Sequence, residues 1–213
     1  MTEQTVKTRK GPVSKKTAPI FNLHNVIPRR GFDHVPLSAD VAAQCQSIIQ
    51  EYQKAEELGA YDLTPRHKLL LPGYARQDKA LIAEALAYEL QLPLLRVNYA
   101  NLVAGSINLA RNDLIKIFQH IQDEPCVLFI DEFNGVGLFH NTHHDLTDIK
   151  AFNSQVATYI DLLPSTCIFV AATGAISMLE PAHQRSFDIT LDIAYPTDEL
   201  KLACAKKELD PAI

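Results

Sequence analysis

After Pro65, short runs of apolar residues alternate with longer stretches in which apolar residues recur at helical spacing. The runs predict buried strands and the longer stretches predict helices, an alternation typical of a parallel sheet covered by helices. The predicted strands cover residues 68–71, 92–97, 127–130, 168–172 and 189–193, and the predicted helices cover residues 79–90, 112–122 and 148–163. The pattern therefore predicts an α/β fold with a parallel sheet flanked by helices.

The first 64 residues have a different pattern. Residues 1–19 hold five basic side chains among polar residues, Gly and Pro, with almost nothing apolar to bury, and they predict a disordered basic tail. Such a tail either docks on nucleic acid or an acidic partner, or is a solvated leader, and we favour the leader. Residues 20–64 predict a linker and a helix: an irregular apolar segment is followed by Ser38, the N-cap of a helix from Asp40 to about Leu58 that ends at Gly59.

The composition fits one globular domain. A chain of 213 residues is long enough for one α/β domain with short extensions. The formal net charge of -5 disfavours a protein devoted to nucleic acid. No apolar stretch approaches the roughly 20 residues that span a bilayer, and the cysteines are far apart, as is typical of buried thiols in a reducing compartment. We therefore expect a cytoplasmic protein with no membrane partner.

Two adjacent carboxylates, Asp131 and Glu132, follow the apolar run at residues 127–130. Open α/β sheets bind their ligands at the carboxyl ends of the strands, where this pair is expected to lie. In ATPases of the Walker B type, the aspartate holds a magnesium ion, and the glutamate orients and deprotonates the attacking water. The pair is therefore a candidate for metal binding at Asp131 and catalysis at Glu132, and the alternative is an acidic strand end that faces solvent.

Residues 66–80, RHKLLLPGYARQDKA, are followed by a predicted helix and then by Leu-Pro-Leu-Leu at residues 92–95. Together with the acidic pair, this segment resembles the AAA family of AAA+ ATPases, and the resemblance covers roughly residues 38–196. In that family a strand leads into a glycine-rich phosphate-binding loop that ends in Gly-Lys-Thr. Gly73 and Lys79 match the first glycine and the lysine of the loop. The resemblance implies a P-loop NTPase-like AAA+ core at residues 65–196, with Gly73, Lys79 and Asp131 as binding residues and, if nucleotide binding is retained, ATP and Mg2+ as cofactors.

Three residues depart from the phosphate-binding pattern of the family. Asp78 and Arg76 replace glycines, so side chains occupy a turn whose backbone N–H groups would wrap phosphates. A carboxylate about 4 Å from a phosphate oxygen costs on the order of 4 kcal/mol at an effective dielectric constant of 20, which lowers affinity roughly a thousandfold. Ala80 replaces the Thr or Ser whose hydroxyl ligates magnesium. The sequence thus predicts a degenerate Walker A motif.

Other departures lie further along the chain. Gly174 follows the predicted strand at the point where the family has an asparagine that positions water. Arg185 matches one of the paired arginines that complete the site of a neighbouring subunit, while Ser186 replaces the other. Residues 104–109 lack the aromatic residue of a protein-threading pore loop. Residues 197–213 predict a short C-terminal helix or truncated lid, so we expect the helical lid to be largely absent.

A histidine-rich segment is the other candidate for metal binding. His140, His143, His144 and Asp145 have suitable spacing, but they follow the acidic pair in a predicted loop and lack the cysteines of structural zinc sites. We favour a solvated loop.

The leading hypothesis is an AAA+ ATPase-lineage protein whose nucleotide binding and ATP hydrolysis are weak or lost. It would act as a regulatory or structural subunit, assembled with itself or with another AAA+ subunit. One alternative is a functional AAA+ ATPase that completes its site from neighbouring subunits. A second alternative is a nucleic-acid-binding factor that uses residues 1–19, which the net charge disfavours. Whether the protein is an enzyme stays open at this point.

Overall fold

A six-stranded sheet with the order β1-β3-β4-β5-β2-β6 forms the centre of the protein. The computed structural model describes residues 22–73, 76–104, 106–133, 146–193 and 197–209. The strands are β1 (Leu23–Val26), β2 (Lys68–Pro72), β3 (Leu94–Asn98), β4 (Cys126–Asp131), β5 (Cys167–Thr173) and β6 (Ile189–Thr190). β1 pairs antiparallel with β3, and the other four pairs are parallel. The predicted α/β fold is confirmed, with an antiparallel strand added at one edge.

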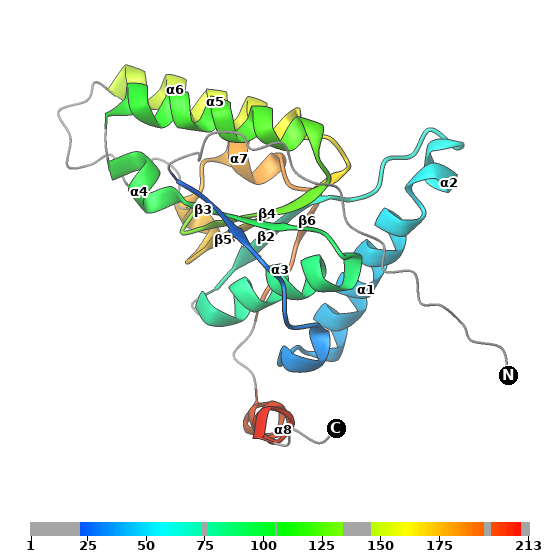
Figure 1. Cartoon of the computed structure of the whole chain (residues 1–213). Coiled ribbons are helices and arrows are strands. Elements are labelled where there is room, and N and C mark those ends of the chain that lie inside the picture. The colour runs from blue at the N-terminus through cyan, green and yellow to red at the C-terminus, as the bar shows by residue number, and fades with distance from the viewer. Residues whose placement is uncertain (1–21, 74–75, 105, 134–145, 194–196, 210–213) are drawn as a thin grey trace, which may run out of the picture.

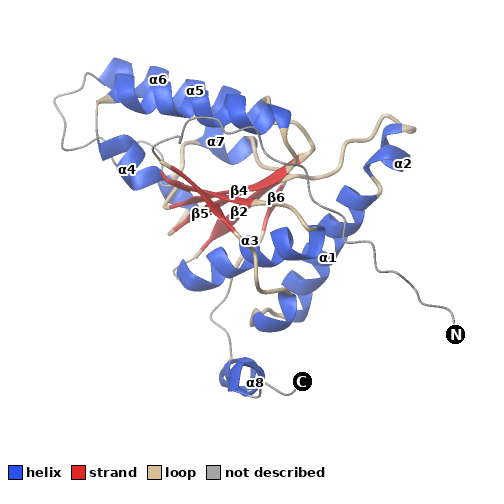
Figure 2. Ribbon diagram, viewed as in Figure 1, coloured by secondary structure: helices blue, strands red, loops and turns tan. Residues whose placement is uncertain are grey.

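Helices cover both faces of the sheet (Figure 1). The helices are α1 (Ala39–Gln53), α2 (Ala55–Gly59), α3 (Arg76–Leu90), α4 (Tyr99–Ala104), α5 (Ile107–Asp123), α6 (Leu146–Asp161), α7 (Pro181–Arg185) and α8 (Asp198–Leu209). Figure 2 shows α5, α6 and α7 on one side of the strands and α1 and α3 on the other. Short 3-10 helices cover Phe32–His34 and Ile176–Met178.

The continuous apolar sequence of β4 follows from its place in the middle of the sheet. Cys126, Leu128 and Ile130 pack in the core shared with α5 and α6, whereas Val127 and Phe129 pack in the core shared with α1 and α3. Successive side chains of a strand point to opposite faces. Because both faces are covered, every position from Cys126 to Ile130 is buried. Asp131 therefore lies at the carboxyl end of a strand that is packed on both faces.

The region before the core contains two elements that differ from the prediction. β1 lies in the segment expected to be irregular and pairs with β3, although two of its four residues are exposed. The predicted helix from Asp40 to Leu58 is interrupted at Lys54, whose ψ of 21° leaves the helical region and separates α1 from α2. The predicted N-cap is confirmed, because the Ser38 side chain accepts a hydrogen bond from Val41 N at 3.4 Å. Residues 1–19 lie outside the described residues, so the basic tail and the nucleic-acid alternative stay predictions.

The helices after β3 also begin earlier than predicted. α4 was not predicted, and α5 starts at Ile107 instead of Asn112. Ser106 caps α5, because its hydroxyl accepts a hydrogen bond from Leu109 N at 3.3 Å. The part of the chain that the structure describes contains no helix that is both long enough and apolar enough to cross a bilayer.

Candidate functional site

The predicted phosphate-binding and acidic residues meet at the carboxyl ends of the central parallel strands. Gly73 follows β2, and Asp131 ends β4. β5 lies between these two strands and runs parallel to both. Lys79, in the first turn of α3, reaches these strand ends with its ammonium group. The carboxyl ends of three adjacent parallel strands and the start of a helix therefore form the candidate site, as expected for an open α/β sheet.

Lys79 is held inside the protein. Its side chain is 2% exposed, and Nζ donates hydrogen bonds to the backbone oxygens of Gly73 and, at 2.8 Å, Thr173. A buried ammonium group requires such partners, because burial without them is costly. The lysine thus ties the beginning of the loop to the end of β5.

Gly73 has a backbone conformation that favours glycine. Its φ is +123°, and a Cβ atom added there would lie 3.1 Å from the backbone oxygen of Ile193. Both the left-handed conformation and the close approach disfavour any larger residue. This glycine is therefore required by the turn out of β2, whatever the site binds.

α3 begins at Arg76, three residues before the predicted start at Lys79. The positions at which the family pattern has loop glycines thus belong to the first helical turn. Arg and Asp lose less backbone entropy in a helix than Gly does. The substitutions at Arg76 and Asp78 therefore account for a helical turn where the resemblance implies a loop.

The acidic pair ends β4 with a sharp change of backbone direction. Asp131 Oδ1 accepts a hydrogen bond from Glu132 N at 2.9 Å, and Glu132 has a φ of +55°. Phe133 N then donates to the backbone oxygen of Ala172 at 2.8 Å, which returns the chain to β5. A left-handed conformation at a non-glycine residue costs about 1 kcal/mol or more, and such residues are frequent at active sites.

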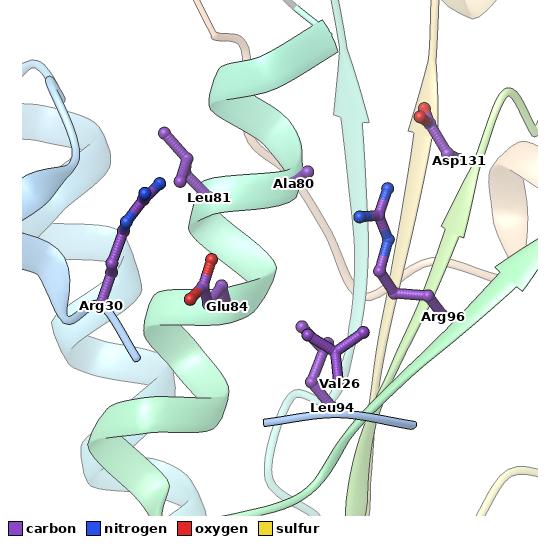
Figure 3. Close-up of a pocket in the computed structure, with 8 residues that line it drawn as sticks. All are labelled: Val26, Arg30, Ala80, Leu81, Glu84, Leu94, Arg96 and Asp131. Carbon is purple, nitrogen blue, oxygen red and sulfur yellow. The ribbon is translucent and has the colours of Figure 1, made fainter. Parts of the chain in front are cut away.

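A pocket of about 460 Å³ lies between α3 and the sheet, and it includes Asp131. Its charged residues are Arg30, Glu84, Arg96 and Asp131, and Figure 3 shows the side chain of Arg96 extending from β3 towards the end of β4, where Asp131 lies. Ala80 on α3 forms another part of the wall. The pocket thus adjoins the candidate site and adds arginine side chains to it.

Arg96 was missed by sequence reasoning. It interrupts the apolar run of β3, and its side chain is exposed. Its Cζ atom lies 5.5 Å from the centre of the Phe129 ring on the neighbouring strand, a cation–π contact. The signal available in the sequence was a charged residue within a predicted buried strand, which marks a place where one face of the strand is open.

The predicted metal residue Asp131 has few oxygen ligands around it in this pocket. Glu84 is the other carboxylate of the lining, and its Oε1 accepts a hydrogen bond from Arg29 N at 3.0 Å. Ala80 contributes a methyl group, which cannot ligate a metal. Among the described residues, no group of three or more His, Cys, Asp or Glu side chains is arranged to hold a metal ion. The histidine-rich segment at residues 140–145 lies outside the described residues.

Gly174, at the end of β5, leaves open space beside the site. A Cβ atom added there would meet no other atom within 4 Å. The preceding Thr173 is 1% exposed, and its hydroxyl donates to the backbone oxygen of Ala175 at 3.2 Å. The position matching the family's water-positioning asparagine therefore lacks a side chain, although the fold has room for one.

Arg185 lies apart from the pocket residues, at the end of the short helix α7, where it is exposed. The helix itself is anchored: His183 is fully buried, and its Nε2 lies 2.9 Å from the backbone oxygen of Asn153 on α6. Burial lowers the pKa of His183, since it penalises the charged imidazole. Ser186, the position of the second family arginine, is buried. His183 thus holds α7 against α6, and Arg185 is exposed at the end of this helix.

Comparison with known proteins matches residues 69–195 to the family described as "ATPase family associated with various cellular activities (AAA)". The chain is 27% identical over 169 residues to an uncharacterized AAA family ATPase, y4kL, of Sinorhizobium fredii, an alignment that covers 79% of this chain and 51% of that protein. It is 23% identical over 193 residues to a putative 26S proteasome regulatory subunit homolog of Methanocaldococcus jannaschii, covering 89% of this chain and 51% of the relative.

The structure is similar to the crystal structure of the FIGL-1 AAA domain, with a TM-score of 0.71 at 17% sequence identity. The similarity covers 89% of this chain and 63% of the matched chain, and it supports the fold. The chain spans about half the length of the curated relatives described above.

Proposed function

The chain belongs to the AAA family of ATPases, and from this premise we propose that its own ATP binding and hydrolysis are weak or lost and that it acts through assembly. In this proposal it is a regulatory or structural subunit, joined to copies of itself or to an intact AAA+ ATPase. ATP and Mg2+ are the ligands of the lineage, and Gly73, Lys79 and Asp131 are the residues that would meet them.

The observation that carries the proposal is the helical turn at the start of α3, together with the binding of the Lys79 ammonium group by backbone oxygens outside that helix. In active P-loop enzymes, backbone N–H groups of the loop and the lysine ammonium cradle the β- and γ-phosphates. Here α3 already includes Arg76, and the ammonium group of Lys79 is bound by the backbone oxygens of Gly73 and Thr173. A nucleotide would have to unwind this turn and compete with two carbonyl groups for the lysine. Ala80 and Gly174 add the loss of a magnesium ligand and of a water-positioning side chain.

Calorimetric titration of ATP with Mg2+, followed by measurement of phosphate release, tests this proposal. We expect weak binding, and turnover of the wild type no faster than that of Glu132→Gln, which cannot deprotonate water. Tight binding together with turnover that depends on Glu132 would overturn the proposal.

The proposed role in assembly is supported by the exposure of Arg185 at the end of an anchored helix. Arginines supplied from a neighbouring subunit stabilise transition-state charge during phosphoryl transfer. We expect Arg185→Ala to lower the ATPase rate of an intact partner in a purified complex by about tenfold or more without changing the unfolding temperature of this chain. Lys150→Ala, on the exposed face of α6, is the matched control. An unchanged partner rate in a verified complex would reject the role of Arg185.

The second candidate function is an active ATPase that completes its site from neighbouring subunits. The specific observation in its favour is the left-handed backbone at Glu132, because strain of this kind is concentrated at functional sites. Glu132-dependent phosphate release from the assembled protein would favour this candidate over the first.

A further inference from the structure

Arg96 is a cation that the resemblance to AAA ATPases did not predict. It lines the same pocket as Ala80 and Asp131. In P-loop ATPases, the residue at the Ala80 position supplies a hydroxyl oxygen to magnesium, and the residue at the Asp131 position holds the same ion. An ion bound by both positions would therefore occupy the pocket that Arg96 enters (Figure 3).

The register of the sheet fixes Arg96 on this side of the protein. Arg96 pairs with Phe129, and Asn98 pairs with Asp131. Side chains two residues apart on a strand share a face, so Asp131 and Phe129 point to the same side of β4 and Arg96 lies beside them on β3. The Phe129 ring, 5.5 Å from the Arg96 Cζ atom, supports the planar guanidinium group. Arg96 is therefore placed by two strands of a packed sheet.

The chemistry of the pocket fits an anion better than a divalent cation. Magnesium requires near-octahedral oxygen ligands at short distances, and Ala80 has no oxygen to offer in its side chain. Arg30 and Arg96 balance the charges of Glu84 and Asp131, so the pocket lining has no net negative charge to attract a metal ion, and the guanidinium groups can bind phosphate oxygens. One oxygen of Glu84 already accepts a hydrogen bond from Arg29 N.

We propose that the guanidinium group of Arg96 takes the role of the magnesium ion, so that the nucleotide binding that this chain retains is independent of divalent cations. A guanidinium group is always charged at physiological pH, and its fork of N–H donors matches the oxygens of a phosphate chain. Asp131, which lines the same pocket, is then a neighbour of Arg96 instead of a metal ligand. The inference rests on the proposed function, in which ATP binding is weak and the metal-dependent hydrolysis is weak or lost.

Calorimetric titration of ATP into the full chain, once with excess Mg2+ and once with EDTA, tests the inference. We expect the wild-type dissociation constants in the two buffers to agree within about twofold, and Arg96→Gln to weaken binding in EDTA by about tenfold or more. Arg96→Lys, which keeps the charge and loses the fork, should have an intermediate affinity. Lys150→Gln removes one positive charge from the exposed face of α6, on the other side of the sheet, and should bind as the wild type does.

A second variant should make ATP binding depend on Mg2+. Combining Arg96→Gln with Ala80→Thr removes the cation and supplies a hydroxyl ligand, so ATP should then bind about tenfold more tightly with Mg2+ than with EDTA. Wild-type binding that Mg2+ strengthens by about tenfold, or Arg96→Gln binding ATP in EDTA as well as the wild type does, would overturn the inference. Absence of any ATP binding also overturns it, while the proposed role in assembly stands. The proposed function instead fails if phosphate release depends on Glu132.

Discussion

Restoring the phosphate-binding loop should make the protein less stable and a better ATP binder at the same time. The change combines Arg76→Gly, Asp78→Gly and Ala80→Thr. The first two substitutions give the loop back its backbone freedom and remove a carboxylate, and the third supplies a hydroxyl to Mg2+. Because α3 already begins at Arg76, all three positions are helical in the wild type.

The expected loss of stability follows from these helical positions. Glycine costs about 1 kcal/mol in a helix interior and less in the first turn, and threonine costs about 0.5 kcal/mol relative to alanine. The sum is about 2 kcal/mol. For a chain of this size each kcal/mol corresponds to about 2–4 °C, so the unfolding temperature should fall by about 4–8 °C. ATP at a hundred times its dissociation constant should stabilise the folded state of the variant by about 2.7 kcal/mol.

Differential scanning calorimetry with and without MgATP measures both effects, and titration calorimetry gives the affinity. The control is Ala42→Gly with Ala43→Gly, at exposed positions in the second turn of α1, which should lower the unfolding temperature without changing ATP binding. An unfolding temperature within about 1 °C of the wild type would show that the first turn of α3 contributes no helical stability. A lower temperature without an affinity gain of about tenfold would refute the reasoning that this turn limits ATP binding.

Two further predictions concern the surroundings of the site. Gly174→Asn should change the free energy of unfolding by less than about 0.5 kcal/mol in urea denaturation, because a Cβ atom there meets nothing within 4 Å; a loss above about 2 kcal/mol would contradict the open space. Burial lowers the pKa of His183 in the folded protein from its ordinary value of 6.5. As the pH drops below 6.5, the histidine of the unfolded chain binds a proton before that of the folded protein does, so the free energy of unfolding falls. Urea denaturation between pH 7.5 and 5 should therefore show a steeper loss for the wild type than for His183→Gln, and equal slopes would exclude this contribution.

The central strands could be predicted from the sequence because their burial is continuous. β4 and β5 are apolar runs covered on both faces, and the structure confirms both within two residues at each end. β1 could not be predicted in the same way, since Leu23–Val26 holds two polar residues that remain exposed. That segment becomes a strand through its antiparallel pairing with β3. Pairing with a distant strand is a tertiary contact, and no local periodicity records it.

Some residues of the candidate site could likewise be predicted from local sequence, whereas others depend on tertiary contacts. Gly73, Lys79 and Asp131 were found from motif spacing, and the structure brings them to the carboxyl ends of the central parallel strands. Their roles in binding stay predictions. Arg96 belongs to no motif, and it reaches the same pocket as Asp131 because β3 pairs in parallel with β4. The early start of α3 likewise depends on the residues that replaced glycine, whose helical preference a motif comparison does not weigh.

The retained acidic pair has a structural role that is independent of hydrolysis. Asp131 accepts a hydrogen bond from the N–H group of Glu132, which satisfies a backbone donor at the point where Glu132 turns left-handed. That turn lets Phe133 bond to β5 and enter the core, where it is fully buried and packs against Tyr99 and His183. His183 lies on α7, the helix that ends in Arg185. An aspartate at this position therefore helps to place the surface proposed for assembly, and a chain that had lost hydrolysis would still need it.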